Sequence, residues 1–232
     1  METLKRLLPP FLDGAWTGLV LLFFASALPV FVAWALLAWK RPKSVPLPFL
    51  LSVILGILTI PFALLMTFIT SFLFEGPLAG APSVFLHTPL GEELGRLAVF
   101  SLFLLPVAGL ECRRDPSRSF ASAAILAALL AGMAFSAVET AMYAPKTPLL
   151  LLLRAGFSWP VHAACSVFVA RAVLALRVPE GRGGWLRILW FPAAVLVHAA
   201  WNASLLMPQL FVPFTLSCGC MLLVFLALKK GR

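Results

Sequence analysis

The sequence predicts an all-α membrane protein, a polytopic bundle of about seven transmembrane helices. Hydrophobic residues make up 62% of the 232 residues and charged residues only 12%, whereas roughly 25% of a soluble domain is charged. Apolar runs long enough to cross a hydrocarbon core, which needs about 20 residues, follow one another along the chain. The connections between them are short, so we expect a single helical domain over residues 1–232.

Each predicted helix is an apolar run bounded by charged residues or prolines. Pro9 and Pro10 keep the N-terminal stretch out of the first helix, because proline breaks a helix interior. The seven predicted helices cover residues 15–39, 46–74, 88–110, 120–143, 149–176, 186–207 and 210–228.

Basic residues in the connections predict the orientation of these helices. They gather after the first, third, fifth and seventh runs, and the other connections hold only Lys146. Because cytoplasmic loops are rich in lysine and arginine, the N-terminus is predicted outside and the C-terminus in the cytoplasm. Lys5 and Arg6 are the exception, since they put positive charge on the outer side. The net charge of +9 is spread over loops rather than gathered in a patch, so we expect a lipid bilayer as partner and no nucleic acid.

Charged residues inside the apolar runs are the first candidates for a functional site. Glu92, Glu93 and Arg96 begin the third helix, and Glu139 lies within the fourth. One charged side chain at the centre of a membrane helix costs about 2.5–3.5 kcal/mol. We therefore expect these groups to turn inward and to pair with one another or with water.

The fifth and sixth helices add imidazoles and a carboxamide. His198 and Asn202 lie four residues apart, on one face of a helix. A polar stripe at four-residue spacing follows the fifth helix: Arg154, Ser158, His162 and Ser166. Carboxylates, imidazoles and a carboxamide can activate a water, move its proton and hold an oxyanion, which is the minimum set for peptide hydrolysis. The predicted orientation places all of them in the outer half of the bilayer.

Each of these residues also has an alternative role. The acids and Arg96 can anchor a helix end, and Glu139 and the histidines can form hydrogen bonds between helices. A proton-coupled transporter using Glu139 and the histidines is a further alternative, although no inverted repeat supports it. The sequence contains no nucleophile elbow, H-E-x-x-H motif or phosphate-binding loop.

The order and spacing of these motifs resemble the PrsW family of intramembrane proteases, relatives of the CAAX-processing and bacteriocin-processing membrane proteases. Four motifs carry the resemblance: Glu92-Glu93-Leu94-Gly95-Arg96, Phe135 to Glu139 with Tyr143 one turn later, His162 after Pro160, and His198 to Trp201-Asn202. They place the catalytic helices at about residues 88–207. Glutamate at position 139 favours the PrsW branch, because the CAAX branch resembles F-x-x-x-H there. Thr140 and Arg96 depart from the asparagine and lysine common in the family.

The resemblance implies an intramembrane endopeptidase of a prokaryotic inner or plasma membrane. Its substrate would be a single-span membrane protein such as an anti-sigma factor, cut near the extracytoplasmic face by site-1-type cleavage in a stress response. A CAAX-like protease is the alternative within the wider group. The implied catalytic residues are Glu92, Glu93, Arg96, Glu139, His162, His198 and Asn202.

We expect a water activated directly by glutamate and no cofactor. Glu92 or Glu93 would be the general base, oriented by Arg96, and Glu139 would position His162 or share its proton. His198 and Asn202 would hold the substrate carbonyl and its oxyanion. The alternative is a zinc ion held by His162, His198 and Glu139.

Overall fold

The described part of the chain is helical. The computed structural model describes residues 27–35, 46–74, 81–114, 119–142, 148–177, 188–205, 209 and 211–230, and none of these residues forms a strand. After a short helix over 27–35, the elements are α4 (Pro46–Phe74), α5 (Ala81–Arg114), α6 (Phe120–Met142), α7 (Pro148–Arg177), α8 (Trp190–Ser204) and α9 (Phe211–Lys230). The predicted all-α class is confirmed for these residues.

The bounds of α4, α6, α7 and α9 lie within two residues of the predicted runs. α5 begins seven residues earlier and ends four residues later than predicted, and α8 begins four residues later. The His87 ring finds a partner on the neighbouring helix, since its Nε2 lies 2.8 Å from the carbonyl oxygen of Thr67 in α4. Tyr143 and much of the first predicted helix lie outside the described residues.

Four of the helices are long and apolar enough to cross a membrane. They cover Leu47–Phe74, Phe85–Arg113, Phe120–Met142 and Arg154–Arg177, and Phe211–Val224 forms a shorter apolar helix. Large apolar side chains of α4, such as Phe68 and Phe72, are more than 60% exposed. An apolar exterior of this kind suits contact with lipid. The count of seven spans and the orientation of the termini stay predictions.

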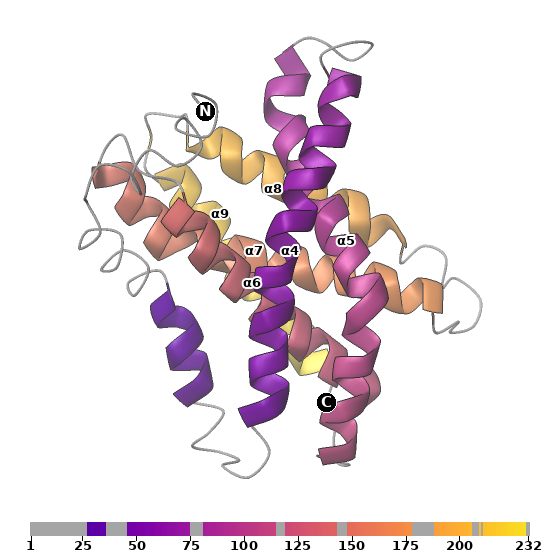
Figure 1. Cartoon of the computed structure of the whole chain (residues 1–232). Coiled ribbons are helices and arrows are strands. Elements are labelled where there is room, and N and C mark those ends of the chain that lie inside the picture. Colours follow the sequence, from indigo (N-terminus) through magenta and orange to yellow (C-terminus); the bar gives the residue numbers. More distant parts are fainter. Residues whose placement is uncertain are drawn as a thin grey trace, which may run out of the picture.

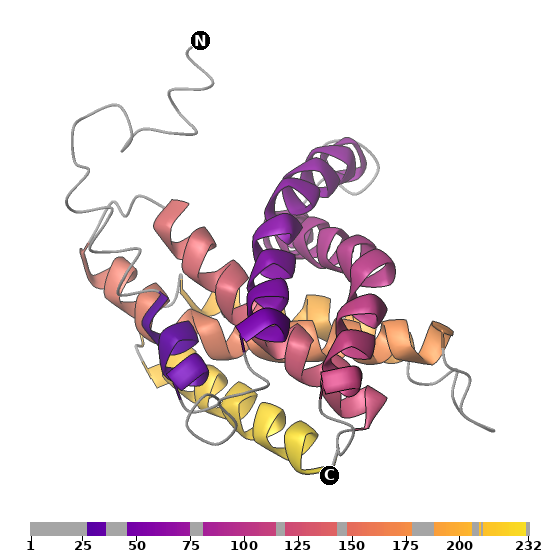
Figure 2. The same ribbon diagram turned by 60° about the horizontal axis from the view of Figure 1, so that its bottom comes forward.

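The helices are arranged around α6 and α7. Figures 1 and 2 show α4 and α5 as a hairpin whose connected ends extend beyond the other helices. Below these ends α4 packs on α6, α5 contacts α7 and α8, and α7 contacts α8 and α9. Segments far apart in the sequence therefore meet at the middle of the structure.

Two glycine contacts set the distances between the helices that carry the candidate site. A Cβ at Gly95 of α5 would lie 2.6 Å from the Cα of Ala63 in α4. A Cβ at Gly132 of α6 would lie 2.9 Å from the Cα of Ala163 in α7 and would also meet the carbonyl oxygen of His162. Small residues let membrane helices approach backbone to backbone. These contacts hold the backbone beside Glu93 and His162 in place.

Candidate active site

Four helices, α5, α6, α7 and α8, bring the predicted site residues together. α5 and α7 contribute residues from their N-terminal halves, α6 contributes Glu139 near its C-terminal end, and α8 contributes His198 from its middle and Asn202 near its C-terminal end. All of them except Asn202 are buried: Glu92, Glu93, Arg96, Glu139, His162 and His198. The sequence-based expectation that these polar groups turn inward is therefore met.

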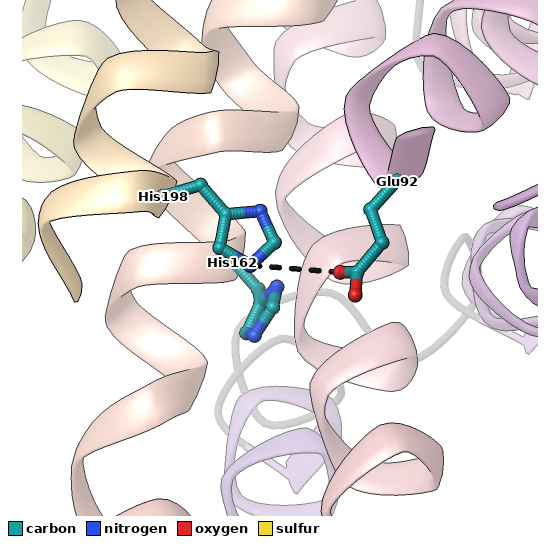
Figure 3. A group of neighbouring side chains, drawn as sticks. All are labelled: Glu92, His162 and His198. Atoms are coloured by element: carbon teal, nitrogen blue, oxygen red, sulfur yellow. Dashed lines mark ion pairs between the residues drawn. The ribbon is translucent and has the colours of Figure 1, made fainter. Parts of the chain in front are cut away.

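Glu92, His162 and His198 form the centre of this cluster (Figure 3). One ligand atom of each side chain lies within 4.8 Å of the other two. Nε2 of His198 is 3.5 Å from Oε2 of Glu92, and the two imidazole rings stand almost perpendicular with centroids 4.9 Å apart. Glu92 Oε2, both ring nitrogens of His162 and His198 Nε2 are buried and have no hydrogen-bond partner among the described residues. Buried polar atoms in this state normally have a partner such as a water or an ion.

Glu93 holds the other side of the His198 ring. Its Oε1 lies 2.8 Å from Nδ1 of His198, and its carboxylate also forms an ion pair with Arg96 one turn later on α5. Glu93 is fully buried and Arg96 is almost fully buried. The two adjacent acids are thus in different surroundings, because Glu93 binds Arg96 and His198 whereas Glu92 faces the two imidazoles.

Glu139 makes a similar contact with His162. Its Oε2 lies 2.8 Å from Nε2 of His162, and its Oε1 forms an ion pair with Arg154 of α7. Phe135, one turn earlier on α6, packs its ring against His162 at 5.2 Å, and the guanidinium of Arg96 lies 4.7 Å from the centre of the same ring. Such a distance suits a cation–π contact. Phe135 therefore lies between the two ion pairs.

Three placements differ from the sequence-based interpretation. The acid grouped with both imidazoles is Glu92, whereas the zinc alternative had named Glu139. Asn202 is half-buried on α8 and makes no hydrogen bond to the described residues of the cluster. Arg154 was not among the predicted site residues, although the four-residue polar stripe of α7 contained the signal.

With all three carboxylates ionised and both imidazoles neutral, the cluster has one negative charge in excess. Glu92, Glu93 and Glu139 face two guanidinium groups, those of Arg96 and Arg154, and the remaining members are two imidazoles. A buried excess charge is costly unless a counter-ion compensates it. The residues present fit a divalent cation.

The chemical type of the three ligand groups also fits a zinc ion. Two imidazoles and one carboxylate are a ligand set found in catalytic zinc sites. Each imidazole has a carboxylate at its other nitrogen, Glu93 for His198 and Glu139 for His162. That pattern fixes the tautomer and the direction of ligating histidines.

A comparison with protein families identifies the family of this chain. The family model described as PrsW family intramembrane metalloprotease matches residues 45–228, a range that contains every residue of the cluster. Searches of curated proteins and of solved structures found no match. Because the matched range covers most of the chain, this protein belongs to the PrsW family of intramembrane metalloproteases.

Proposed function

We propose that this intramembrane protease is an endopeptidase whose hydrolytic centre is formed by Glu92, His162 and His198, with a zinc ion bound there. The observation that carries the proposal is the convergence of three buried ligand atoms, one from each of α5, α7 and α8, within 4.8 Å. None of these atoms has a hydrogen-bond partner among the described residues. This geometry supports the zinc alternative, with Glu92 as its carboxylate, over the metal-free site that the sequence favoured.

A zinc ion bound there would lower the pKa of a coordinated water and polarise a carbonyl group. The chain's own residues prepare the site for that chemistry. Glu93 accepts the Nδ1–H of His198, so Nε2 of that ring carries a free lone pair toward Glu92. Oε2 of Glu139 lies 2.8 Å from Nε2 of His162, so we assign Nδ1 of that ring to the metal. Each imidazole is thus held as a neutral donor with a fixed direction.

With Oε2 of Glu92 assigned to the zinc ion, we assign proton transfer to the other oxygen of the same carboxylate, Oε1. Glu93 and Glu139 each form an ion pair with an arginine, whereas the ion contact of Glu92 is with His198. A carboxylate in this position can accept the proton of the attacking water and return it to the leaving amine. Should the active protein prove free of metal, Glu92 would activate the water alone, as the sequence-based hypothesis stated.

The substrate we propose is a single-span membrane protein, such as an anti-sigma factor, in a prokaryotic cell membrane. A site buried among membrane helices requires a substrate that enters the bilayer. Glu139 and Asn202 lie within three residues of the C-terminal ends of α6 and α8, and these ends face outward if the basic connections are cytoplasmic. Cleavage near the extracytoplasmic face would suit the start of a stress response.

Purified protein in proteoliposomes and a single-span reporter peptide test this function. We expect cleavage of the reporter, about one equivalent of zinc, and loss of both in His162→Ala. Glu111→Gln is a matched control, because Glu111 is a buried acid of the same helix about 28 Å further along α5 at 1.5 Å per residue. Cleavage without bound metal would support the glutamate-activated water instead. An intact reporter would favour the proton-coupled transporter.

A further inference from the structure

We propose that Arg154 is a positioning residue of this site: by pairing with Glu139 it fixes the ring of His162 and so strengthens metal binding. The inference rests on the proposed hydrolytic centre and adds a residue to it. Arg154 does not belong to the cluster of three ligand atoms, and its guanidinium acts through another side chain. Its effect is therefore on the direction of His162 and not on the reacting atoms.

The Glu139 carboxylate bridges two residues of the same neighbouring helix. Oε1 forms an ion pair with Arg154 and Oε2 lies 2.8 Å from Nε2 of His162. Arg154 and His162 are eight residues apart on α7, about 12 Å along the axis at 1.5 Å per residue. The pair with Arg154 thus decides which way the second oxygen of Glu139 points.

The register of α6 against α7 keeps these partners in place. Ser136 Oγ and Ser158 Oγ are 2.7 Å apart, in the middle of the contact. Further along the contact between α6 and α7, Gly132 lies against the backbone of His162 and Ala163. The order along α7 is therefore Arg154, Ser158 and His162, opposite Glu139, Ser136 and Gly132.

Because the ion pair between Arg154 and Glu139 is buried, it has a strong effect on the orientation of the Glu139 carboxylate. Only 7% of Arg154 and 8% of Glu139 is exposed. A buried carboxylate that loses its cation is left uncompensated, whereas removing both charges together is often tolerated. Without Arg154 the Glu139 carboxylate would no longer have a fixed place, and Nε2 of His162 would lose the carboxylate contact that orients the ring.

Arg154 differs from Arg96 in that its carboxylate partner lies on another helix. Arg96 pairs with an acid of its own helix, three residues earlier. Arg154 pairs with an acid of the adjacent helix, so this contact links α6 to α7. Both guanidinium groups neutralise carboxylates that hold a histidine. Arg96 thus acts on His198 through Glu93, and Arg154 acts on His162 through Glu139.

The experiment compares four variants of the full chain: Arg154→Met, Arg154→Lys, Glu139→Gln and the double variant Glu139→Gln with Arg154→Met. Arg171→Met is the matched control, because Arg171 lies on the same helix but over the ring of Trp190. The readouts are zinc affinity by competition with a chelator, and kcat and KM for the single-span reporter. Loss of an outer-shell partner typically weakens metal binding about 10–100-fold.

We expect Arg154→Met to weaken zinc binding by about that factor and to lower kcat with little change in KM. Arg154→Lys should keep most of the affinity, and Arg171→Met should equal the wild type. The double variant should bind zinc no more weakly than Glu139→Gln alone, because Arg154 acts through Glu139.

Two outcomes would overturn the proposal. One is wild-type zinc affinity and kcat in folded Arg154→Met. The other is a double variant whose loss is the product of the two single losses, since Arg154 would then act independently of Glu139. If Arg154→Met does not fold, the double variant, in which no lone charge is buried, is compared with Glu139→Gln alone, and a weaker zinc affinity of the double variant then overturns the proposal. A wild-type protein that cleaves without zinc would refute the proposed cation, and the kcat of the variants would then decide the role of Arg154.

Discussion

Oε1 of Glu93 lies 2.8 Å from Nδ1 of His198, and this contact distinguishes the two adjacent acids of α5. Glu93 is engaged on one side by His198 and on the other by Arg96. Glu92, the preceding residue, has a buried oxygen without a hydrogen-bond partner among the described residues. Two neighbouring glutamates therefore have different tasks, and substitutions at the two positions should have different effects.

Glu92→Gln should abolish cleavage and leave the protein folded. The amide cannot accept the proton of a water, and it is a poor metal ligand compared with a carboxylate. Removing a buried charge that lacks an arginine partner should also leave thermal stability equal or higher. Reporter cleavage and a thermal unfolding scan check both statements. Normal cleavage by Glu92→Gln would remove this residue from the catalytic centre.

Glu93→Gln should instead destabilise the fold. It leaves the buried Arg96 guanidinium without its carboxylate, and breaking a buried ion pair typically costs about 3–5 kcal/mol. The ring of His198 loses its orienting group as well, so zinc affinity should fall about 10–100-fold. Chemical denaturation and chelator competition measure the two effects. Arg96→Lys, which keeps the charge but loses the planar fork, should retain some activity. Equal stability of Glu93→Gln and wild type would contradict this account.

Gly95→Ala should separate α5 from α4 and destabilise the protein. The added Cβ would meet the backbone of Ala63, which cannot yield as a flexible side chain would. Overpacking of this kind typically costs about 1–3 kcal/mol. Gly219→Ala on α9 is the matched control, since a Cβ there meets nothing within 4 Å. The control should be neutral or more stable, because alanine favours a helix. Unfolding curves of the two variants should shift in opposite directions or by clearly different amounts.

Asn202→Ala tests the oxyanion role that the sequence suggested. Loss of one oxyanion donor typically lowers turnover about 10²–10³-fold. Because Asn202 is half-buried and makes no hydrogen bond to the described residues of the cluster, its loss should leave thermal stability unchanged. Asn202→Asp should be worse, since a carboxylate repels the developing negative charge. Measuring kcat and KM separately tests this role, because loss of an oxyanion donor lowers kcat with little change in KM. An unchanged kcat would show that another group is the oxyanion donor.

The side of the membrane on which the site opens can be tested with cysteine labelling. In a variant without the native cysteines, Lys146→Cys should react in intact cells with a membrane-impermeant thiol reagent. Ser117→Cys should react only after the membrane is opened. The reason is the positive-inside distribution of the basic connections. The reverse pattern would place the site on the cytoplasmic side and favour a CAAX-like protease.

The sequence by itself determined the helices and most members of the site. Long apolar runs had to be helices, because a backbone in lipid must satisfy its own hydrogen bonds. Glu92, Glu93, Arg96 and Glu139 had to turn inward, because charged side chains are costly in lipid. Both conclusions follow from local composition and from the bilayer as solvent, so no knowledge of helix packing was needed.

Only the tertiary structure decided which partner each charged group takes. Glu92 and Glu93 are adjacent, and successive residues of a helix point about 100° apart, so the position of α8 determines which acid meets Nδ1 of His198. The role of Arg154 depends on the register of α6 against α7, which Gly132 and the contact between Ser136 and Ser158 set. Side chains on different helices meet through packing geometry. Spacing along the chain does not encode that geometry.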